Sequence, residues 1–353
     1  MQLELREDEV ALLADLCRIA SPSGEEGEAA AFLVDFLRRH GWEAGVDAAG
    51  NAVGRMGRGE KTLLFLGHLD TVPGYIPVRR ENGCLFGRGA VDAKGALAAF
   101  LAAVERVKAA LRLHLVFIAA VGEETVLSPG ARYVCDRYRP DFCLVGEPSG
   151  WAGLTLGYKG CLNFTATVRR PVGHSAGPQD SAPEVAIQIW TWVQGLCSAL
   201  NAGKSGFAAL EASLREMGSR SDGLLEEAWL RIGLRLPPGL APAAMMERLQ
   251  GLGPRVELSF SPAQPAFKGE KNTPLARAFL AAIRAEGGEP TFKLKSGTAD
   301  MNIVGPAWGV PIVAYGPGDS RLDHTPNEHL PLAEYARAIA VLAHVLTHPA
   351  LLD

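Results

Sequence analysis

Residues 62–74 have the sequence TLLFLGHLDTVPG, in which an apolar run ends at a histidine and an aspartate. The run at 62–66 is continuous rather than alternating, which predicts a strand buried on both faces of a parallel sheet. His68 and Asp70 are two residues apart, so on an extended backbone their side chains point the same way. A carboxylate behind an imidazole fixes the tautomer and favours metal binding through the free nitrogen. From these residues alone, a capping histidine with a turn aspartate is an equally good interpretation.

Length and composition narrow the class of protein. The chain has 353 residues, enough for two domains, and its net charge of −4 argues against nucleic acid as a partner. It contains no apolar run of the ~20 residues that a membrane helix needs. Its acidic start is not typical of a signal peptide. Its six cysteines form no Cys-x-x-Cys pair, which favours free thiols and a cytoplasmic location.

Further continuous apolar runs predict more parallel strands, at 113–121, 141–145 and 310–315. Helical spacing predicts helices at 9–20, 94–110, 129–138, 274–285 and 333–346. Ser23 and Glu26 have the spacing of a capping box for another helix that extends to about residue 39. The alternation of strands and helices predicts an α/β fold, with a mostly parallel sheet covered by helices on both faces.

The pattern changes between residues 157 and 265. Strands and helices are predicted in the order βαββαβ, at 160–169, 182–200, 208–217, 228–236, 241–252 and 255–260. This order is typical of a split, ferredoxin-like α+β unit. We therefore expect residues 157–265 to form an inserted domain, and residues 1–156 and 266–353 to form the catalytic domain.

Polar residues follow the predicted strands of the first domain, where ligands bind in parallel sheets. They are His68 with Asp70, Glu123 with Glu124, Glu147, and His324. Asp92 lies in a glycine-rich loop before a helix. Each has an alternative role as a helix cap, a loop charge or a turn residue. Two histidines and three carboxylates together suit two divalent ions, most naturally zinc.

These residues lie in motifs that resemble a known family. The motifs are GHLDTVP at 67–73, GRGAVDAKG at 87–95, GEE at 122–124, GEP at 146–148, VGHSA at 172–176 and HTPNE at 324–328. They are similar to the signature motifs of the M20 dinuclear metallohydrolases, in the same order over nearly the whole chain. The resemblance implies a zinc-peptidase-like catalytic domain with two divalent ions, Zn²⁺ or alternatively Co²⁺.

The resemblance also implies roles for these residues. Asp92 would bridge both ions and precede a cis peptide bond. His68 and Glu147 would complete the ligand set of one ion, and Glu124 and His324 that of the other. Asp70 would orient His68, and Glu123 would act as the general base.

Five further residues are expected near the substrate by the same resemblance. His174 would stabilise the oxyanion, in its own or a partner subunit. Arg235 would bind a carboxylate, although Gly233 stands where relatives have an acid. Lys159, Gly297 and Thr298 would line the substrate. An ordinary surface or turn role is an alternative for each of them.

Residues 295–304, KSGTADMNIV, resemble the branch of the family that acts in lysine and arginine biosynthesis. Similar enzymes release lysine or ornithine from the γ-carboxyl of the C-terminal glutamate of LysW, a small acidic carrier protein. The alternatives are an N-acetylornithine or N-acetyl-lysine deacetylase, a small-peptide carboxypeptidase, and an inactive relative that only binds a metal or ligand. The resemblance also implies a homodimer formed through the inserted domain, which would act as a lid.

Other enzyme classes fit the sequence poorly. The Gly87-x-Gly89 pair before a helix has Asp92 where a dinucleotide-binding motif requires glycine. Gly203-Lys204-Ser205 lacks the upstream glycine of a P-loop, and no Gly-x-Ser-x-Gly elbow occurs.

Overall fold

The computed structural model describes residues 5–174 and 176–352. The chain divides into two compact units. The first comprises the described parts of Met1–Gly157, Gly269–Leu294 and Ala299–Asp353, and the second comprises the described parts of Tyr158–Lys268 and Lys295–Thr298. The second unit therefore starts and ends close to the predicted insertion and also takes in a short later segment.

The sheet of the first unit has a parallel centre. Its strands follow the order β1-β2-β6-β3-β7-β15-β8, and β14 also pairs with β8. The four central strands pair in parallel; they are β6 (His114–Ala120), β3 (Thr62–His68), β7 (Phe142–Val145) and β15 (Ile312–Ala314). The outer strands are β1 (Glu43–Val46), β2 (Ala52–Met56), β8 (Gly153–Tyr158) and β14 (Thr291–Lys295). Antiparallel pairs join β1 to β2, β2 to β6 and β8 to β15.

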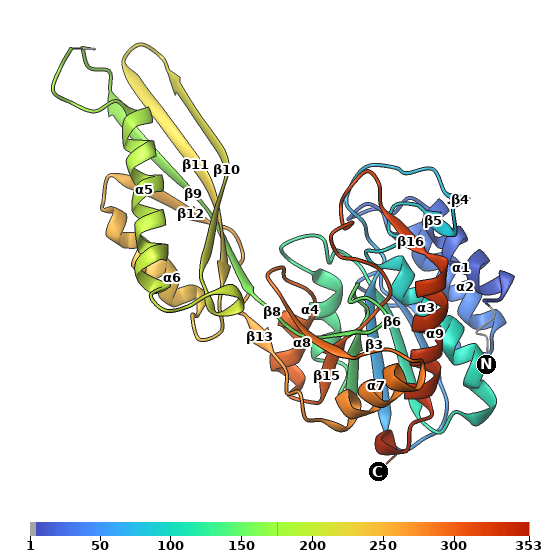
Figure 1. Cartoon of the computed structure of the whole chain (residues 1–353). Coiled ribbons are helices and arrows are strands. Elements are labelled where there is room, and N and C mark those ends of the chain that lie inside the picture. Colours follow the sequence, from blue (N-terminus) through green and yellow to red (C-terminus); the bar gives the residue numbers. More distant parts are fainter. Residues whose placement is uncertain (1–4, 175, 353) are drawn as a thin grey trace. The chain divides into compact units, whose positions relative to one another are not determined.

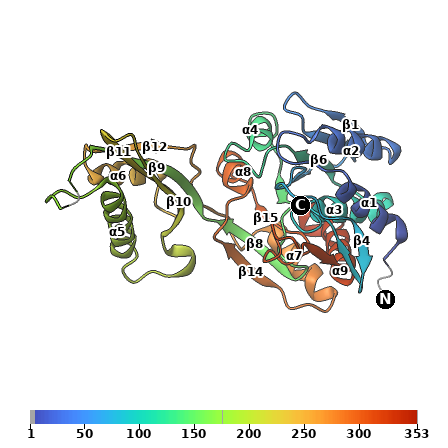
Figure 2. The same cartoon turned by 90° about the horizontal axis from the view of Figure 1, so that it is seen from above.

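Helices cover both faces of this sheet (Figures 1 and 2). One face packs against α1 (Glu7–Arg18), α2 (Gly27–Arg39), α3 (Lys94–Val107), α7 (Pro274–Ala285) and α9 (Leu332–Leu346). On the other side lie α4 (Pro129–Cys135) and α8 (Met301–Trp308), which contact each other. A small sheet, in the order β16-β5-β4, is formed by β4 (Arg79–Glu81), β5 (Cys84–Phe86) and β16 (His329–Pro331). Short 3₁₀ turns occur at Lys108–Ala110 and Pro349–Leu351.

An aromatic cluster lies at the centre of the larger core. Phe65 on β3 stacks on Phe100 of α3, with ring centroids 4.2 Å apart, and on Phe117 of β6 at 5.5 Å. All three side chains are fully buried. Such burial stabilises a domain mainly through the hydrophobic effect, and here it anchors the strand that ends at His68.

The second unit has its own sheet and core. The four strands are antiparallel in the order β10-β11-β9-β12. They are β9 (Gly160–Pro171), β10 (Glu211–Ser221), β11 (Leu225–Leu236) and β12 (Val256–Phe260). The helices α5 (Ala182–Leu200) and α6 (Pro242–Leu249) pack on the buried alternate residues of the sheet. Short 3₁₀ turns occur at Gly206–Ala208 and Gln250–Leu252, and β13 (Phe267–Lys268) ends the main segment of this unit.

The predicted fold class is confirmed. The first unit is an α/β structure with a parallel centre, and the second has the predicted βαββαβ order and the strand order of a ferredoxin-like unit. All six cysteines are free. Among the described residues, no helix combines the length and the apolar character needed to cross a membrane.

The predicted capping box at Ser23 is wrong. Helix α2 begins at Gly27, with Glu26 as its N-cap residue. The Ser23 hydroxyl instead donates to Oδ2 of Asp70, at 2.7 Å. The carboxylate of Glu26 accepts a hydrogen bond from the amide of Gly122, at 3.0 Å. Both side chains thus bind the loops at the strand ends, and these long-range bonds displace the local cap.

Candidate metal centre

The four central strands of the first unit end at one cluster of acids and histidines. β3 ends at His68 itself, Glu123 and Glu124 follow β6, and Glu147 follows β7. His324 lies in the loop after β15. Because these strands are adjacent and parallel, their carboxyl ends share one edge of the sheet.

The carboxylate of Asp92 lies between two imidazoles. Its Oδ1 is 3.2 Å from Nε2 of His68, and its Oδ2 is 3.1 Å from Nε2 of His324. Asp92 belongs to the loop before α3, and its peptide bond to Ala93 is cis, as the resemblance implied. Each carboxylate oxygen therefore faces a different histidine.

Each histidine has a second carboxylate nearby. Oε1 of Glu147 is 3.9 Å from Nε2 of His68, and Oε1 of Glu124 is 3.0 Å from Nε2 of His324. Two sets of ligand atoms, each within 4.8 Å, result: His68 with Asp92 and Glu147, and Asp92 with Glu124 and His324. The structure thus brings all five predicted ligands together, and their binding of metal stays a prediction.

The charges and ligand atoms of this cluster indicate whether it suits cations. Bonds to Asp92 and Glu124 raise the pKa of His324 to about 10. Burial alone would lower the pKa of His68, but its contacts with Asp70 and Asp92 outweigh burial and raise it. Both shifts favour protonated imidazoles between these carboxylates in the metal-free chain. Because imidazole nitrogens and carboxylate oxygens are good ligands for zinc and related ions, the donor set fits two divalent cations that replace these protons.

Asp70 organises the centre in two ways. Its backbone carbonyl oxygen lies 2.8 Å from Nδ1 of His68, whereas its carboxylate oxygen is 3.6 Å from that nitrogen. The carboxylate accepts hydrogen bonds from the amides of Glu123 and Glu124, at 3.0 and 2.9 Å, and from the Ser23 hydroxyl. Asp70 thus orients the imidazole mainly through its main chain, and its side chain fixes the turn that carries the two glutamates. The spacing of the motif gave no sign of this second role.

Glu123 is held in a setting that favours proton transfer. Its pKa is raised well above the ordinary value, chiefly by burial, with further contributions from Glu147, Asp300 and Glu124. His68 opposes this rise. A carboxylate with a raised pKa is a stronger proton acceptor than an ordinary carboxylate, which is the property that a general base needs.

Asp300 is a buried acid that sequence reasoning did not select. It is the N-cap residue of α8, and the residue is 2% exposed. Burial raises its pKa to about 7, with opposition from His68 and from a hydrogen bond with Ser128. Its Oδ1 has no hydrogen-bond partner in the described part of the chain. The sequence pointed to Asp300 only through its position two residues after Thr298, a predicted substrate residue.

The residues predicted to bind substrate all belong to the second unit. Lys159 is fully buried there. Its ammonium group donates to the carbonyl oxygen of Ala209 at 2.7 Å and pairs with Glu211 at 2.8 Å. Its contact with substrate stays a prediction.

The remaining predicted substrate residues differ in their surroundings. Nη1 of Arg235 lies 3.5 Å from Oγ1 of Thr298, and a side chain added at Gly297 would meet open space. His174 is exposed, and its Nδ1 accepts a hydrogen bond from the amide of Ala176 at 3.1 Å. The structure therefore brings together Arg235, Thr298 and the adjoining glycine.

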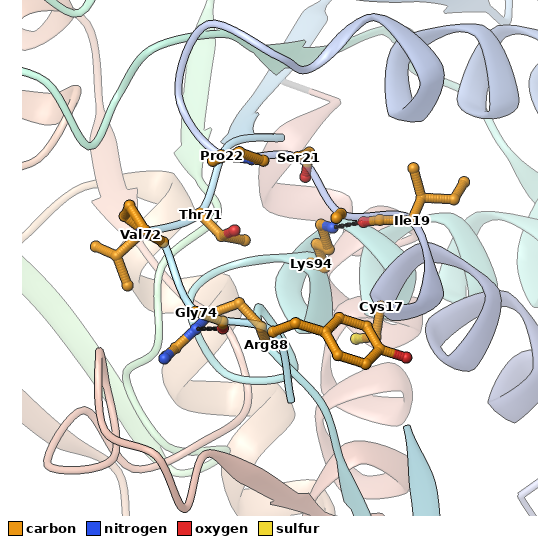
Figure 3. Close-up of a pocket in the computed structure, with 12 residues that line it drawn as sticks. Cys17, Ile19, Ser21, Pro22, Thr71, Val72, Gly74, Arg88 and Lys94 are labelled. Atoms are coloured by element: carbon orange, nitrogen blue, oxygen red, sulfur yellow. Dashed lines mark hydrogen bonds between the residues drawn. The ribbon is translucent and has the colours of Figure 1, made fainter. Parts of the chain in front are cut away.

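A cavity of about 150 Å³ lies beside the loop that follows Asp70 (Figure 3). Its lining includes Thr71, Arg88, Lys94 and Cys17. The ammonium group of Lys94 donates to two main-chain carbonyl oxygens at the end of α1, at 3.0 and 2.7 Å. Burial raises the pKa of Cys17 to about 12, so its thiol is a poor nucleophile. Lys94, at the start of α3, therefore connects that helix to the end of α1.

Comparison with known proteins identifies the family. The sequence model of "Peptidase family M20/M25/M40" matches residues 64–348. The chain belongs to this family. The predicted resemblance to M20 metallohydrolases is thereby confirmed.

Several relatives of this M20 chain are similar over nearly their whole length. A "[LysW]-lysine hydrolase" of Deinococcus radiodurans is 49% identical over 347 residues, which cover 95% of each chain. A "Putative [LysW]-lysine/[LysW]-ornithine hydrolase" of Thermococcus kodakarensis is 42% identical and covers 96% of this chain and 92% of its own. Together with the family match, these relatives make the chain a metal-dependent hydrolase that acts on an amide bond.

Solved structures show the same fold. A tripeptidase from Staphylococcus aureus has a TM-score of 0.80 at 20% identity and covers 97% of this chain and 98% of its own. An M20 metallo-carboxypeptidase from Sulfolobus solfataricus has a TM-score of 0.77 at 19% identity and covers 97% and 99%.

Proposed function

We propose that this M20 hydrolase releases lysine, ornithine or both from the carrier protein LysW. The bond cleaved would join the γ-carboxyl of the carrier's C-terminal glutamate to the α-amino group of the amino acid. The observation that carries this proposal is the 49% identity to a [LysW]-lysine hydrolase over 95% of both chains. The names of several further relatives agree with it.

The geometry of the first unit suggests how this bond is cleaved. His68, Asp92 and Glu147 would hold one divalent ion, and Asp92, Glu124 and His324 would hold the other. Divalent ions at such a centre polarise a carbonyl group and lower the pKa of water, and we propose zinc, with cobalt as an alternative.

Glu123 would carry the proton during the reaction. It is adjacent to a ligand but belongs to neither set of ligand atoms. As the oxygen of water bonds to the carbonyl carbon, the Glu123 carboxylate accepts its proton. When the C–N bond breaks, Glu123 returns that proton to the leaving amine. The products are the free amino acid and the carrier's glutamate carboxyl.

We also propose that the second unit forms a lid and a homodimer contact, with His174 reaching an active site. The Arg235–Thr298 pair would bind the carboxylate of the released amino acid. The six free cysteines are compatible with the cytoplasm as the proposed compartment.

The test is turnover of LysW-linked lysine and ornithine against N-acetyl-lysine and N-acetylornithine, with and without a chelator. We expect carrier-linked substrates to be preferred and the chelator to abolish turnover. The Glu123→Gln variant should lose about 10²- to 10⁴-fold in kcat because it lacks the proton acceptor, and it should keep its metal. Glu43→Gln, at an exposed position of strand β1, is the matched control and should be fully active.

Two outcomes would contradict parts of this proposal. Faster turnover of the N-acetylated compounds would favour the deacetylase alternative. Retained turnover in Glu123→Gln would remove the general-base role.

A further inference from the structure

Glu328 binds the main chain at Asp92 without belonging to either set of ligand atoms. Its Oε1 accepts hydrogen bonds from the amides of Val91 and Asp92, at 2.9 and 3.1 Å. The side chain is 1% exposed. A buried carboxylate that accepts two main-chain hydrogen bonds fixes the peptide plane between those residues. That plane sets the direction of the Asp92 side chain.

Arg88 connects the other carboxylate oxygen of Glu328 to two further loops. Its Nη1 donates to Oε2 of Glu328 at 2.8 Å and to the carbonyl oxygen of Thr325 at 3.2 Å. Its Nε donates to the carbonyl oxygen of Gly74 at 3.0 Å (Figure 3). Thr325 follows His324, and Gly74 is in the loop that begins after Asp70. One arginine–glutamate pair therefore connects three segments that carry residues of the metal centre.

We propose that the Arg88–Glu328 pair positions Asp92 between His68 and His324 and thereby sets the affinity for both metal ions. This inference rests on the metal assignment in the proposed function. Because Asp92 is common to both sets of ligand atoms, a small rotation of its peptide plane moves one carboxylate oxygen away from each histidine. Loss of the Arg88–Glu328 pair should then weaken the binding of both ions together. Loss of Glu124 or Glu147 instead removes a ligand from only one set.

Glu328→Gln tests this positioning role. The amide keeps the size of the side chain but brings an N–H group against the guanidinium of Arg88, so the ion pair is lost. We expect the affinity for both ions to fall about 10- to 100-fold. Titration of Zn²⁺ into the chelated full-length protein, followed by calorimetry, measures both sites. In metal-saturated enzyme, kcat should fall while KM stays close to that of the wild type.

Glu9→Gln is the matched control. Glu9 is also a buried glutamate of the first unit, and it pairs with Arg106 at 2.5 and 2.7 Å. Its carboxylate bonds to Arg106 of α3 and to the amide of Arg6 just before α1, and both partners lie outside the loops that carry the predicted ligands. Its loss should lower the thermal stability of the metal-free protein and leave both zinc affinities unchanged. Arg88→Lys is the second variant in case Glu328→Gln does not fold, because it keeps the charge but its single nitrogen cannot occupy the positions of both Nε and Nη1.

The outcomes separate this inference from the proposed function. Weakened binding of both ions in Glu328→Gln or Arg88→Lys, with wild-type binding in Glu9→Gln, supports the positioning role. Wild-type zinc affinities in the folded variants, or weakening of one ion only, would overturn it. Failure of the wild-type protein to bind a pair of ions would instead contradict the metal assignment on which this inference rests.

Discussion

The carboxylates around each imidazole of the candidate metal centre determine how strongly that imidazole holds a proton. His324 is half exposed, yet its bonds to Asp92 and Glu124 raise its pKa to about 10. His68 is buried, which would lower its pKa, but its carboxylate neighbours raise it. A histidine must lose its proton to bind a metal ion. Both pKa shifts therefore make protons compete with metal.

We expect metal affinity to fall as the pH is lowered from 8 to 6. Since this range lies below the raised pKa of His324, binding must displace its proton. Each displaced proton should cost about a factor of ten in affinity per pH unit. Calorimetric titration of the chelated protein, in buffers with different ionisation enthalpies, counts the protons released.

A matched pair of histidines controls this measurement. His344→Gln alters a histidine that pairs with Glu286 at 2.9 Å, outside the metal centre, and should leave proton release unchanged. His324→Gln should reduce it. Metal binding that is independent of pH would contradict the assigned protonation.

At the level of the strands, glycines make room for the aromatic core just before two of the predicted ligands. A Cβ atom at Gly146 would lie 2.5 Å from the ring of Phe65, and one at Gly67 would lie 2.7 Å from Leu97. The Phe65 ring is packed against Phe100 and Phe117 and has little freedom to move. These glycines therefore let β3 and β7 bring their ligands close together.

We expect Gly146→Ala to destabilise the protein by about 1–3 kcal/mol, because the added methyl group overpacks the core. The clash should also displace Glu147. The affinity for the ion that Glu147 would bind should then fall more than the affinity for the other ion. Urea unfolding and zinc titration measure the two effects. Gly195→Ala is the control, because Gly195 is exposed on α5 with open space beside it. It should be neutral or stabilise by up to about 1 kcal/mol.

The elements around the metal centre were predictable because their signals are local. The run at 62–66 and the similar run that forms β6 are continuous because parallel strands are buried on both faces. The ligands follow because such strands end at the binding edge. Length and order of the apolar runs were therefore enough to predict which acids and histidines share that edge of the sheet, and their roles as metal ligands stay a prediction.

The supporting contacts were not predictable, because they join residues far apart in the chain. Ser23 fits a local capping box, yet it bonds to Asp70. Glu328 lies in the HTPNE motif at 324–328, but its bonds to the amides of Val91 and Asp92 depend on the folded loops. Sequence spacing describes which side chains share an element and says little about which loops meet.

The whole molecule consists of two units with separate hydrophobic cores. All five predicted metal ligands lie in the first unit, and all five predicted substrate residues lie in the second. A ligand stabilises only the folded part that binds it. Metal should therefore stabilise one core and not the other.

We expect calorimetric unfolding of the full-length protein to show two transitions, of which only one responds to metal. At 100 times the dissociation constant, each bound ion should stabilise the first unit by about 2.7 kcal/mol, and a chelator should reverse this. Leu230→Ala identifies the transition of the second unit, because Leu230 is fully buried in its core and its loss should cost about 2–5 kcal/mol. If the chelator shifts the transition that Leu230→Ala shifts, the two cores unfold together and the assignment of metal binding to a separately stable first unit fails.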